Sequence, residues 1–599
     1  MDTTTARHPE DGGSIFGHRP GLFVLFFTEM WERFSYYGMR VLFVVFLLRE
    51  AFNGNLWDRA DAGALYGIYT GLVYFTPMIG GILADRYFGY RRAVMIGAFI
   101  MTLGHASLAL ETEATWYLGL ALLIIGNGLF KPNISSIVGQ LYAGEPERKD
   151  GAYTIFYMGI NSGAFLGILL CSYYGESVDF GLGFGLAGIF MLVGLIQFYF
   201  GQKIFGNIGL PPSDPNFVML SDEDPEDTAV AKHYEDEVVD ISPRETDTVD
   251  GAGRSVKWGL IGLSIAVTVY VLLTAFLPAK DNFLQTFSNY WMPPIILGSV
   301  IAFVGWIVSD PGLRGAEKDR VWVIVILSFF IVFFWWAFEQ AGSSMTVFAL
   351  DYTDRTLAGS GQTIFTVANL IISVTPIVVL TWVLAKLFAI TFTKYSVANL
   401  ILALGFVGVW GLVIYMLYQQ FTGSETEVPA GWFQVFNSLF IICLAPLFSR
   451  LWERKISWLN SGPIKFALGL TLLGLGFVIL AVGALTIPDG AKTASVSMFW
   501  LIAAYLFHTL GELCISPVGL SYVSKLSPAR LVGLMFGVFF VANFIANFAG
   551  GLTASYIEPI AEQIGLSGFF GIFAAIPIGA AVVLVLISGW MKKMMHGIE

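Results

Sequence analysis

The sequence is poor in charge. Asp, Glu, Lys and Arg make up only 13% of its 599 residues, against about 25% in ordinary soluble domains. This deficit excludes a soluble multi-domain enzyme. Cysteine is also scarce: Cys171, Cys443 and Cys514 each lie inside an apolar run. Neither a disulfide framework nor a redox pair is therefore expected.

Sequence signatures of catalysis are missing as well. No group of His, Cys, Asp and Glu has metal-ligand spacing, and no P-loop, dinucleotide fingerprint or G-x-S-x-G turn occurs in a strand–helix context. We therefore expect no enzyme, no metal and no cofactor. Residues 1–19 are polar and lack the apolar core of a signal peptide, so we expect a cytoplasmic N-terminal tail and no cleaved leader.

Apolar residues dominate instead, at 56% of the chain. A helix needs about 20 mostly apolar residues to cross a bilayer, and sixteen runs of this kind are present. They span residues 20–49, 62–84, 92–110, 115–141, 152–174, 182–205, 256–277, 288–308, 321–350, 361–388, 395–419, 430–452, 464–487, 496–524, 530–555 and 566–592. The sequence therefore predicts an all-α membrane protein with sixteen transmembrane helices.

The distribution of basic residues predicts the orientation. With the N-terminus in the cytoplasm, 25 of the 33 Lys and Arg residues fall on the inner side and five on the outer side. The chain's net charge of −11 has one source, because residues 213–250 hold thirteen Asp or Glu and two Lys or Arg. We expect residues 206–255 to form an acidic, mostly disordered cytoplasmic linker that acts as a solvated tether.

Seven ionisable residues lie within the predicted spans, where charge is costly and tends to mark a transport path. They are Glu29, Glu32, Arg33, Arg40, Lys131, Glu339 and Glu512. The four acids and three bases nearly neutralise one another. An internal salt-bridge network that only holds helices together is the alternative, and we consider it weaker because buried ion pairs stabilise less than apolar packing.

Helical spacing predicts which of these charges share a face. Glu29 and Arg33 are i,i+4 neighbours, and Arg40 follows Arg33 by two turns, with Tyr36 and Tyr37 between them. In other spans, Lys131 and Glu512 precede helix prolines, where a loosened helix suits a ligand site. Because acids dominate the second half and bases the first, a zwitterion fits between them. For His105 and His508, packing is a better interpretation than proton transfer.

Several long motifs resemble those of a known family. The run G-G-I-L-A-D-R-Y-F-G-Y-R-R, Gly80 to Arg92, resembles the loop between spans two and three of the major facilitator superfamily. E-M-W-E-R-F from Glu29, F-Y-M-G-I-N-S-G from Phe156, and G-E-L-C-I-S-P-V-G-L-S from Gly511 look like the signatures of proton-dependent oligopeptide transporters. The resemblance covers most of the chain except residues about 356–429.

The resemblance implies two six-helix bundles that alternate access to a central peptide site. The bundles would be residues 20–205 and residues 321–355 with 430–592, and residues 256–308 would be the helix pair that bacterial members place between them. Residues 356–429, with two apolar runs, would be an inserted transmembrane hairpin. We expect it to be peripheral and lipid-facing, with a gating or oligomer-contact role as the alternative.

The resemblance also implies roles for individual residues. Proton coupling would rest on Glu29, Glu32 and Glu339. The peptide carboxylate would be bound by Arg33, Arg40 and Lys131, and the peptide amino group by Asn161, Asn437 and Glu512. The pocket would be lined by Tyr37, Tyr74, Trp335 and Phe539, and the gating loop would contain Asp85 and Arg86. Asn369 also lies in an apolar span, but the F-Q-x-x-N context favours Asn437.

The chain departs from the family at two of these sites. Mammalian members carry a coupling histidine on the second span, and the matching residue here is Gly67. Coupling must therefore rest on the carboxylates. Where many members have tryptophan after the G-E-L motif, this chain has Phe539, which keeps bulk but lacks a hydrogen-bond donor.

We therefore expect a proton-coupled symporter that imports di- and tripeptides across the bacterial cytoplasmic (inner) membrane as a functional monomer. Its partners would be peptides, protons and the bilayer, with no nucleic acid, and both termini would be cytoplasmic. A transporter of nitrate or another anion is the second hypothesis, but an anion needs no acidic wall. A non-transporting receptor or scaffold is the third, and the seven buried charges argue against it.

Overall fold

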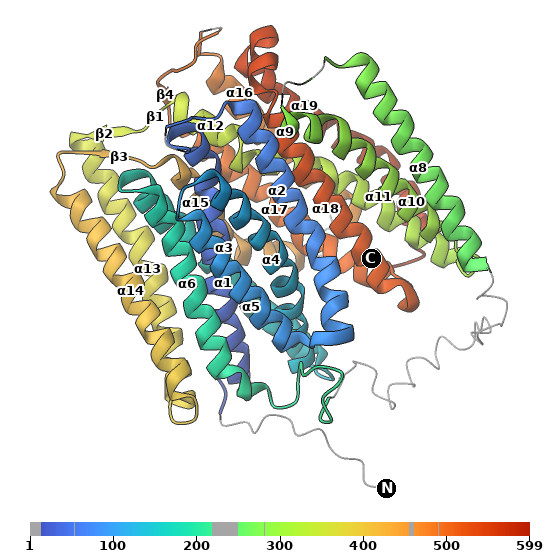
Figure 1. Ribbon diagram of the computed structural model, residues 1–599, viewed down its shortest axis with the longest axis horizontal. Helices are drawn as coiled ribbons and strands as arrows, with labels where there is room; N and C mark the ends of the chain where they lie inside the picture. The colour runs from blue at the N-terminus through green and yellow to red at the C-terminus, as the bar shows by residue number, and fades with distance from the viewer. Residues whose placement is uncertain are drawn as a thin grey trace.

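The structure is a computed structural model that describes residues 13–52, 54–217, 250–278, 280, 282–453, 461–488 and 490–598. These residues are almost entirely helical (Figure 1). The helices are α1 (Pro20–Arg49), α2 (Arg59–Leu83), η1 (Ala84–Phe88), α3 (Tyr90–Leu108), α4 (Glu113–Leu141), α5 (Pro146–Ser177), α6 (Phe180–Gly201), η2 (Gln202–Phe205), α8 (Asp250–Phe276), α9 (Phe283–Thr286), η5 (Phe287–Trp291), α10 (Met292–Val308), α11 (Gly315–Phe338), η6 (Glu339–Gly342), α12 (Ser344–Asp351), α13 (Gly359–Thr391), α14 (Ser396–Thr422), η7 (Ala430–Gln434), α15 (Val435–Glu453), α16 (Gly462–Ala484), α17 (Phe499–Leu526), η8 (Ala529–Leu531), α18 (Val532–Ala554) and α19 (Ile557–Met594).

The predicted number of spans is confirmed. Among the described residues, fourteen helical segments are long and apolar enough to cross a membrane. The helices α1 and α3 complete the sixteen: α1 carries four of the buried charges, and α3 begins beside the pair Arg91 and Arg92. Helix α19 also contains a break at Gly565, whose φ of 73° leaves the helical region. The span predicted at 566–592 begins directly after this break.

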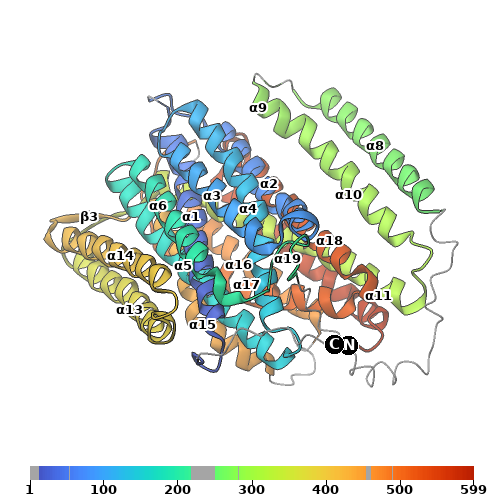
Figure 2. The ribbon, with the colours of Figure 1, turned by 60° about the horizontal axis from the view of Figure 1, so that its bottom comes forward.

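Two bundles face each other, one built from α1–α6 and one from α11, α12 and α15–α19 (Figure 1). The pair α8 and α10 flanks one edge of the molecule, and the hairpin α13–α14 flanks the opposite edge (Figure 2). We call the end of the molecule that holds Pro20 and Met594 the terminal end, and the opposite end, which holds Arg49 and Asp351, the far end.

The far end carries the strands of the structure. β1 (Thr353–Asp354) pairs in parallel with β4 (Val496–Ser497), and β2 (Thr356–Ala358) pairs antiparallel with β3 (Glu425–Glu427). In the second pair Thr356 faces Glu427 and Ala358 faces Glu425. This ribbon joins the two ends of the hairpin α13–α14, so the hairpin is closed at the far end.

The hairpin α13–α14 lies at the periphery (Figure 2). On its inner side, the Tyr174 hydroxyl of α5 donates to Leu412 O at 2.8 Å, and Gly405 packs against Trp31. Its other side exposes large apolar residues, which are Ile364, Val367, Ile371, Val378, Trp382, Leu400, Leu404, Val407 and Ile414. Such a surface suits lipid.

The helices α8 and α10 form a second peripheral pair. They meet at Gly262 and Gly298, where an added Cβ on either glycine would lie within 2.5 Å of the other's carbonyl oxygen. At the terminal end, the Asp310 carboxylate accepts from Arg254 at 3.1 Å and from Arg530 at 2.6 Å. Burial alone would raise the pKa of Asp310, but the hydrogen bonds from Arg530, Gly312 and Arg254 hold it below its ordinary value.

The linker expected at residues 206–255 is only partly described. Residues 218–249 lie outside the described residues, and α8 begins at Asp250, within the predicted linker. The expected disorder of the acidic segment is therefore neither supported nor contradicted.

Small residues bring the two bundles into contact along α2 and α18. Gly63 and Gly67 of α2 face Gly551 of α18, and an added Cβ on Gly551 would lie 2.2 Å from Gly67 Cα. A Cβ on Gly67 would lie 2.8 Å from Phe548 O. A histidine at position 67 therefore has no space in this arrangement, which gives a physical reason for the glycine at this family position.

We expect Gly551→Leu to disrupt this contact, because the atoms that it meets are backbone atoms that cannot rotate away. Overpacking of this kind costs about 1–3 kcal/mol. The purified variant should have a lower thermal unfolding midpoint than the wild type. Gly571→Leu is the matched control, since nothing lies within 4 Å of a Cβ at Gly571. Equal midpoints for Gly551→Leu and the control would contradict the close-packed contact.

Candidate functional site

The first charge cluster lies on α1, where Glu29, Glu32 and Arg33 are all buried. The Arg33 guanidinium forms two hydrogen bonds to Glu32, one of them at 2.6 Å to Oε1, and its Nε lies 3.2 Å from Glu29 Oε1. Asn127 Nδ2 of α4 donates to Glu32 Oε1 at 3.1 Å. The predicted i,i+4 pairing of Glu29 with Arg33 is therefore present.

Two carboxylates share this one guanidinium. Glu29 Oε2 is buried and has no hydrogen-bond partner among the described residues. The cluster carries one excess negative charge, and a buried carboxylate without full pairing favours its protonated form. The arrangement can therefore hold a proton.

Lys131 supplies the nearest uncommitted cation. It is half-buried on α4, its Nζ lies 4.9 Å from the centre of the Tyr74 ring, and no carboxylate of the described residues is within ion-pair distance of it. Helix α4 continues through Pro132, so the helix break expected beside Lys131 does not occur.

A second cluster joins the two bundles. Arg40 of α1 forms an ion pair with Glu339, at the start of η6, and donates from Nε to the Tyr66 hydroxyl at 2.7 Å. All three side chains are buried. Because Arg40 and Glu339 belong to different bundles, the pair breaks if the bundles separate at this level.

A third cluster lies in the second bundle. Asn437 Nδ2 donates to Glu512 Oε2 at 2.8 Å and lies 3.2 Å from Thr509 Oγ1. No cation of the described residues forms an ion pair with Glu512, although the residue is buried. Asn369, by contrast, bonds to Gln420 and Ser373 within the peripheral hairpin. The placement thus favours Asn437 over Asn369.

Tyr37 lies between the first two clusters. Its ring is 5.9 Å from the guanidinium carbons of both Arg33 and Arg40. The half-buried side chain therefore contacts the arginines of both clusters.

The other predicted residues are placed less centrally. Asn161 Nδ2 donates to Tyr157 O at 3.0 Å, Trp335 packs edge-on against Phe334 and Phe338, and Phe539 is buried against Gly519. Asp85 and Arg86 are exposed in η1, and neither forms an ion pair with another described residue.

The buried histidines are packing residues in this arrangement. Neither nitrogen of His105 has a hydrogen-bond partner among the described residues, and His508 packs on the Phe477 ring with centroids 4.5 Å apart. A search of the described residues also finds no group of His, Cys, Asp and Glu that could hold a metal ion.

Further ion pairs join the bundles at the far end. Asp351 accepts from Arg49 at 2.8 Å and from Arg59 at 2.6 Å, and Arg59 also lies 3.3 Å from Glu558. Arg49 and Arg59 belong to the first bundle, whereas Asp351 and Glu558 belong to the second. The structure therefore has its far end closed.

The sequence did not identify several polar partners of the charged residues. They are Asn127, Tyr66 and Thr509, which bond to Glu32, Arg40 and Asn437. Asn127 stands four residues before Lys131, in G-N-G-L-F-K, and this spacing places both on one face of α4. From this spacing Asn127 could have been predicted to lie near the charged site. No comparable sequence pattern points to Tyr66 or Thr509.

Comparisons with known proteins agree with this architecture. The family model described as the POT family matches residues 91–219 and 409–570. The chain is 32% identical to the uncharacterized transporter YclF of Bacillus subtilis, over 98% of this chain and 97% of that protein. It is 31% identical to the peptide transporter YePEPT of Yersinia enterocolitica, over 97% and 96%.

Solved structures give the same result. The crystal structure of a peptide transporter POT in complex with sulfate is 29% identical and has a TM-score of 0.71, with 100% of both chains covered. A POT family transporter in complex with 5-aminolevulinic acid is 25% identical, has a TM-score of 0.70 and is matched over 98% of this chain and 100% of that chain. These relatives are transporters of the major facilitator superfamily fold and not enzymes. The chain belongs to the POT family of membrane transporters.

Proposed function

We propose that this protein imports di- and tripeptides together with protons, by alternating access across the bacterial cytoplasmic membrane. The observation that carries the proposal is that the bases Arg33, Arg40 and Lys131 lie in the first bundle and the acids Glu339 and Glu512 in the second, with Arg40 and Glu339 in direct contact. A dipeptide presents a carboxylate and an ammonium group at a fixed spacing, whatever its side chains. The names of relatives such as the di-/tripeptide transporter of Lactococcus lactis, 28% identical, support peptides as the cargo.

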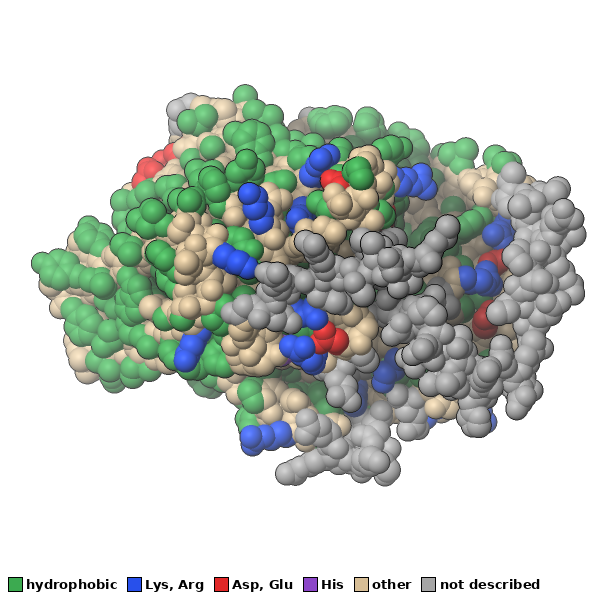
Figure 3. Space-filling view, turned by 90° about the horizontal axis from the view of Figure 1, so that it is seen from below, with side chains coloured by type: hydrophobic (Ala, Val, Ile, Leu, Met, Phe, Trp, Pro, Cys, Tyr) green, Lys and Arg blue, Asp and Glu red, His purple; other side chains and the backbone are tan. Residues whose placement is uncertain are grey.

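The charge distribution supports cytoplasmic termini. Figure 3 looks onto the terminal end, where Lys and Arg outnumber Asp and Glu among the described side chains. Exposed examples at this end are Arg92, Arg314, Lys592 and Lys593. Basic residues are retained on the cytoplasmic side of bacterial membrane proteins, so the far end would face outward.

The two peptide termini would bind to opposite walls. Lys131 is the available cation for the carboxylate, and Arg33 and Arg40 add positive potential from α1. Glu512, with Asn437 beside it and Asn161 on α5, would accept from the ammonium group. Tyr37, Tyr74, Trp335 and Phe539 would line the space between. Binding through the termini explains a broad range of side chains.

Proton coupling would follow from the shared guanidinium of Arg33. A peptide carboxylate that attracts Arg33 competes with Glu29 and Glu32 for it. The carboxylate that loses its partner is buried and takes up a proton, because the neutral form avoids the cost of an unpaired charge. Peptide binding and protonation would then favour each other.

Alternating access would follow from the pairs that join the bundles. Protonation of Glu339 removes the charge that holds Arg40, and the Arg49–Asp351–Arg59 contacts break when the far end opens. The anion-transport hypothesis gains no support, because Glu512 would repel an anion and would have no role.

Uptake of labelled dialanine into liposomes tests the proposal directly. An inward proton gradient should drive accumulation above the external concentration, whereas without a gradient the peptide should only equilibrate. A folded preparation, shown by a cooperative thermal transition, that fails to accumulate dialanine would contradict the proposed function.

Glu32→Gln should uncouple transport, because its amide oxygen can still accept from Asn127 and from one nitrogen of Arg33, but the side chain cannot gain or lose a proton. We expect gradient-driven accumulation to fall to the equilibrium ratio, while exchange of labelled for unlabelled dialanine continues. Glu113→Gln, an exposed acid at the start of α4, is the matched control. Unchanged accumulation in Glu32→Gln would remove this carboxylate from the coupling step.

Glu512→Ala should weaken the binding of dialanine roughly 10- to 100-fold, because a hydrogen bond to a charged group is worth about 1.5–3 kcal/mol. N-acetyl-dialanine lacks the ammonium group, so its affinity should change little. Binding measured by calorimetry for both peptides checks this. Equal losses for the two peptides would show that Glu512 does not hold the amino terminus.

A further inference from the structure

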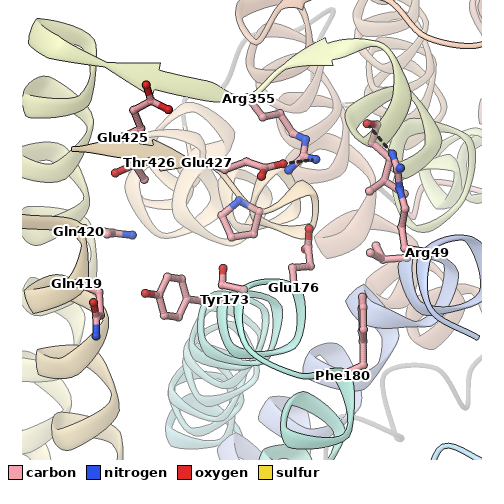
Figure 4. Close-up of a pocket in the computed structure, with 14 residues that line it drawn as sticks. Arg49, Tyr173, Glu176, Phe180, Arg355, Gln419, Gln420, Glu425, Thr426 and Glu427 are labelled. Atoms are coloured by element: carbon pink, nitrogen blue, oxygen red, sulfur yellow. Dashed lines mark hydrogen bonds and ion pairs between the residues drawn. The ribbon is translucent and has the colours of Figure 1, made fainter. Parts of the chain in front are cut away.

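A cavity of about 680 Å³ opens at the far end, away from the charged centre. It lies where the first bundle, the loop after α12 and the hairpin α13–α14 meet (Figure 4). Its lining includes Arg49 of α1, Tyr173 and Glu176 of α5, Gln420 of α14 and Arg355. Its volume exceeds that of a di- or tripeptide and falls in the range of small-molecule sites.

The cations of this cavity are already engaged. Arg49 bonds to Asp351 and to Leu350 O, and Arg355 bonds to Glu427 at 2.8 Å and to Val428 O at 2.6 Å. Two carboxylates of the lining, Glu176 and Glu425, have no ion pair among the described residues. The cavity therefore carries an excess of negative charge, which favours a cationic group.

Glu176 is held in place without a cation. Its carboxylate accepts from Ser172 Oγ at 2.6 Å, from Ala430 N at 2.7 Å and from Gly431 N at 2.9 Å. These neutral donors fix its position, and no cation of the described residues forms an ion pair with it. Such a group can attract an ammonium ion without first breaking a salt bridge.

The cavity also holds polar groups that lack partners. Gln420 is 5% exposed: its Oε1 accepts from Asn369, but its Nε2 has no partner among the described residues. Thr426 is 8% exposed, and its hydroxyl is likewise unpartnered there. Figure 4 shows the Gln420 amide directed from α14 into the space bordered by α5. Buried donors without partners are costly unless a ligand satisfies them.

We infer that this cavity is an outer binding site for peptides with a free amino terminus. The ammonium group would bind to the carboxylates of the cavity, chiefly to that of Glu176. The Gln420 amide would donate to a carbonyl or carboxylate oxygen of the peptide. This inference rests on the proposed function, since the far end would face the outside. A peptide would bind here while the far end is closed and move to the centre when it opens.

The double variant Gln420→Leu/Thr426→Val tests the site. If these groups are only structural, the apolar replacements leave uptake unchanged, and the thermal midpoint falls because the buried Asn369 amide loses its acceptor on Gln420. If they bind peptide, the half-saturating concentration for dialanine uptake rises about fivefold, while the maximal rate stays the same. Thr422→Val is the matched control, because its hydroxyl bonds to Tyr418 O and does not line the cavity.

A dipeptide with a photoreactive benzophenone side chain locates the site directly in the full-length protein in liposomes. Mass spectrometry should find label on residues 419–429 in the wild type, with labelling reduced by excess dialanine and not by N-acetyl-dialanine. Label confined to the charged centre, or unchanged half-saturation in the double variant, would overturn the outer site. Absence of wild-type dialanine uptake would instead overturn the proposed function, so the two failures are distinguishable.

Discussion

The structure depends on the cost of keeping charge inside a membrane. Each buried ion loses solvation free energy when it leaves water, and interactions with neighbouring groups must make up this loss. The chain meets this requirement with partners that belong to different parts of the molecule. Arg40 on one bundle is neutralised by Glu339 on the other, so the stability of the charge depends on how the bundles stand relative to each other. A rearrangement of the bundles therefore changes electrostatics as well as shape.

The two halves of the site use different kinds of compensation. In the first bundle, one guanidinium serves two carboxylates, and Asn127 completes the shell. In the second bundle, neutral groups surround Glu512 and leave its charge available. In the first arrangement a carboxylate that loses the guanidinium can take up a proton in its place. The second arrangement suits a ligand that brings its own positive charge. A zwitterion that bridges them satisfies both at once.

The sequence alone predicted the number of spans and the seven charges within them, of which six are buried and Lys131 is half-buried. Long apolar runs clearly indicate membrane-spanning helices, and a charged residue within such a run is easily recognised. Spacing on one helix also predicted the pairing of Glu29 with Arg33. Contacts between distant helices could not be predicted in this way. Arg40 with Glu339 and Asn127 with Glu32 depend on how helices pack, which no local pattern encodes.

The outer cavity shows the same limit. None of its residues forms a motif, because α1, α5, α14 and the β2–β3 ribbon contribute them from separate parts of the chain. The helix break expected at Pro132 illustrates the converse, since local propensity favoured a break that packing overrides. The sequence thus indicated where the charged residues lie, and the tertiary structure determined their interaction partners.

Asp351 gives the far end a particular kind of closure. Two arginines from the first bundle, Arg49 and Arg59, pair with this one carboxylate of the second bundle, and Arg59 also lies close to Glu558. Moving Asp351 away releases both of its contacts in a single step, at the edge of the membrane, where water can solvate the separated charges. Opening the far end therefore leaves no charge without solvation, which suits a protein that must open and close in every transport cycle.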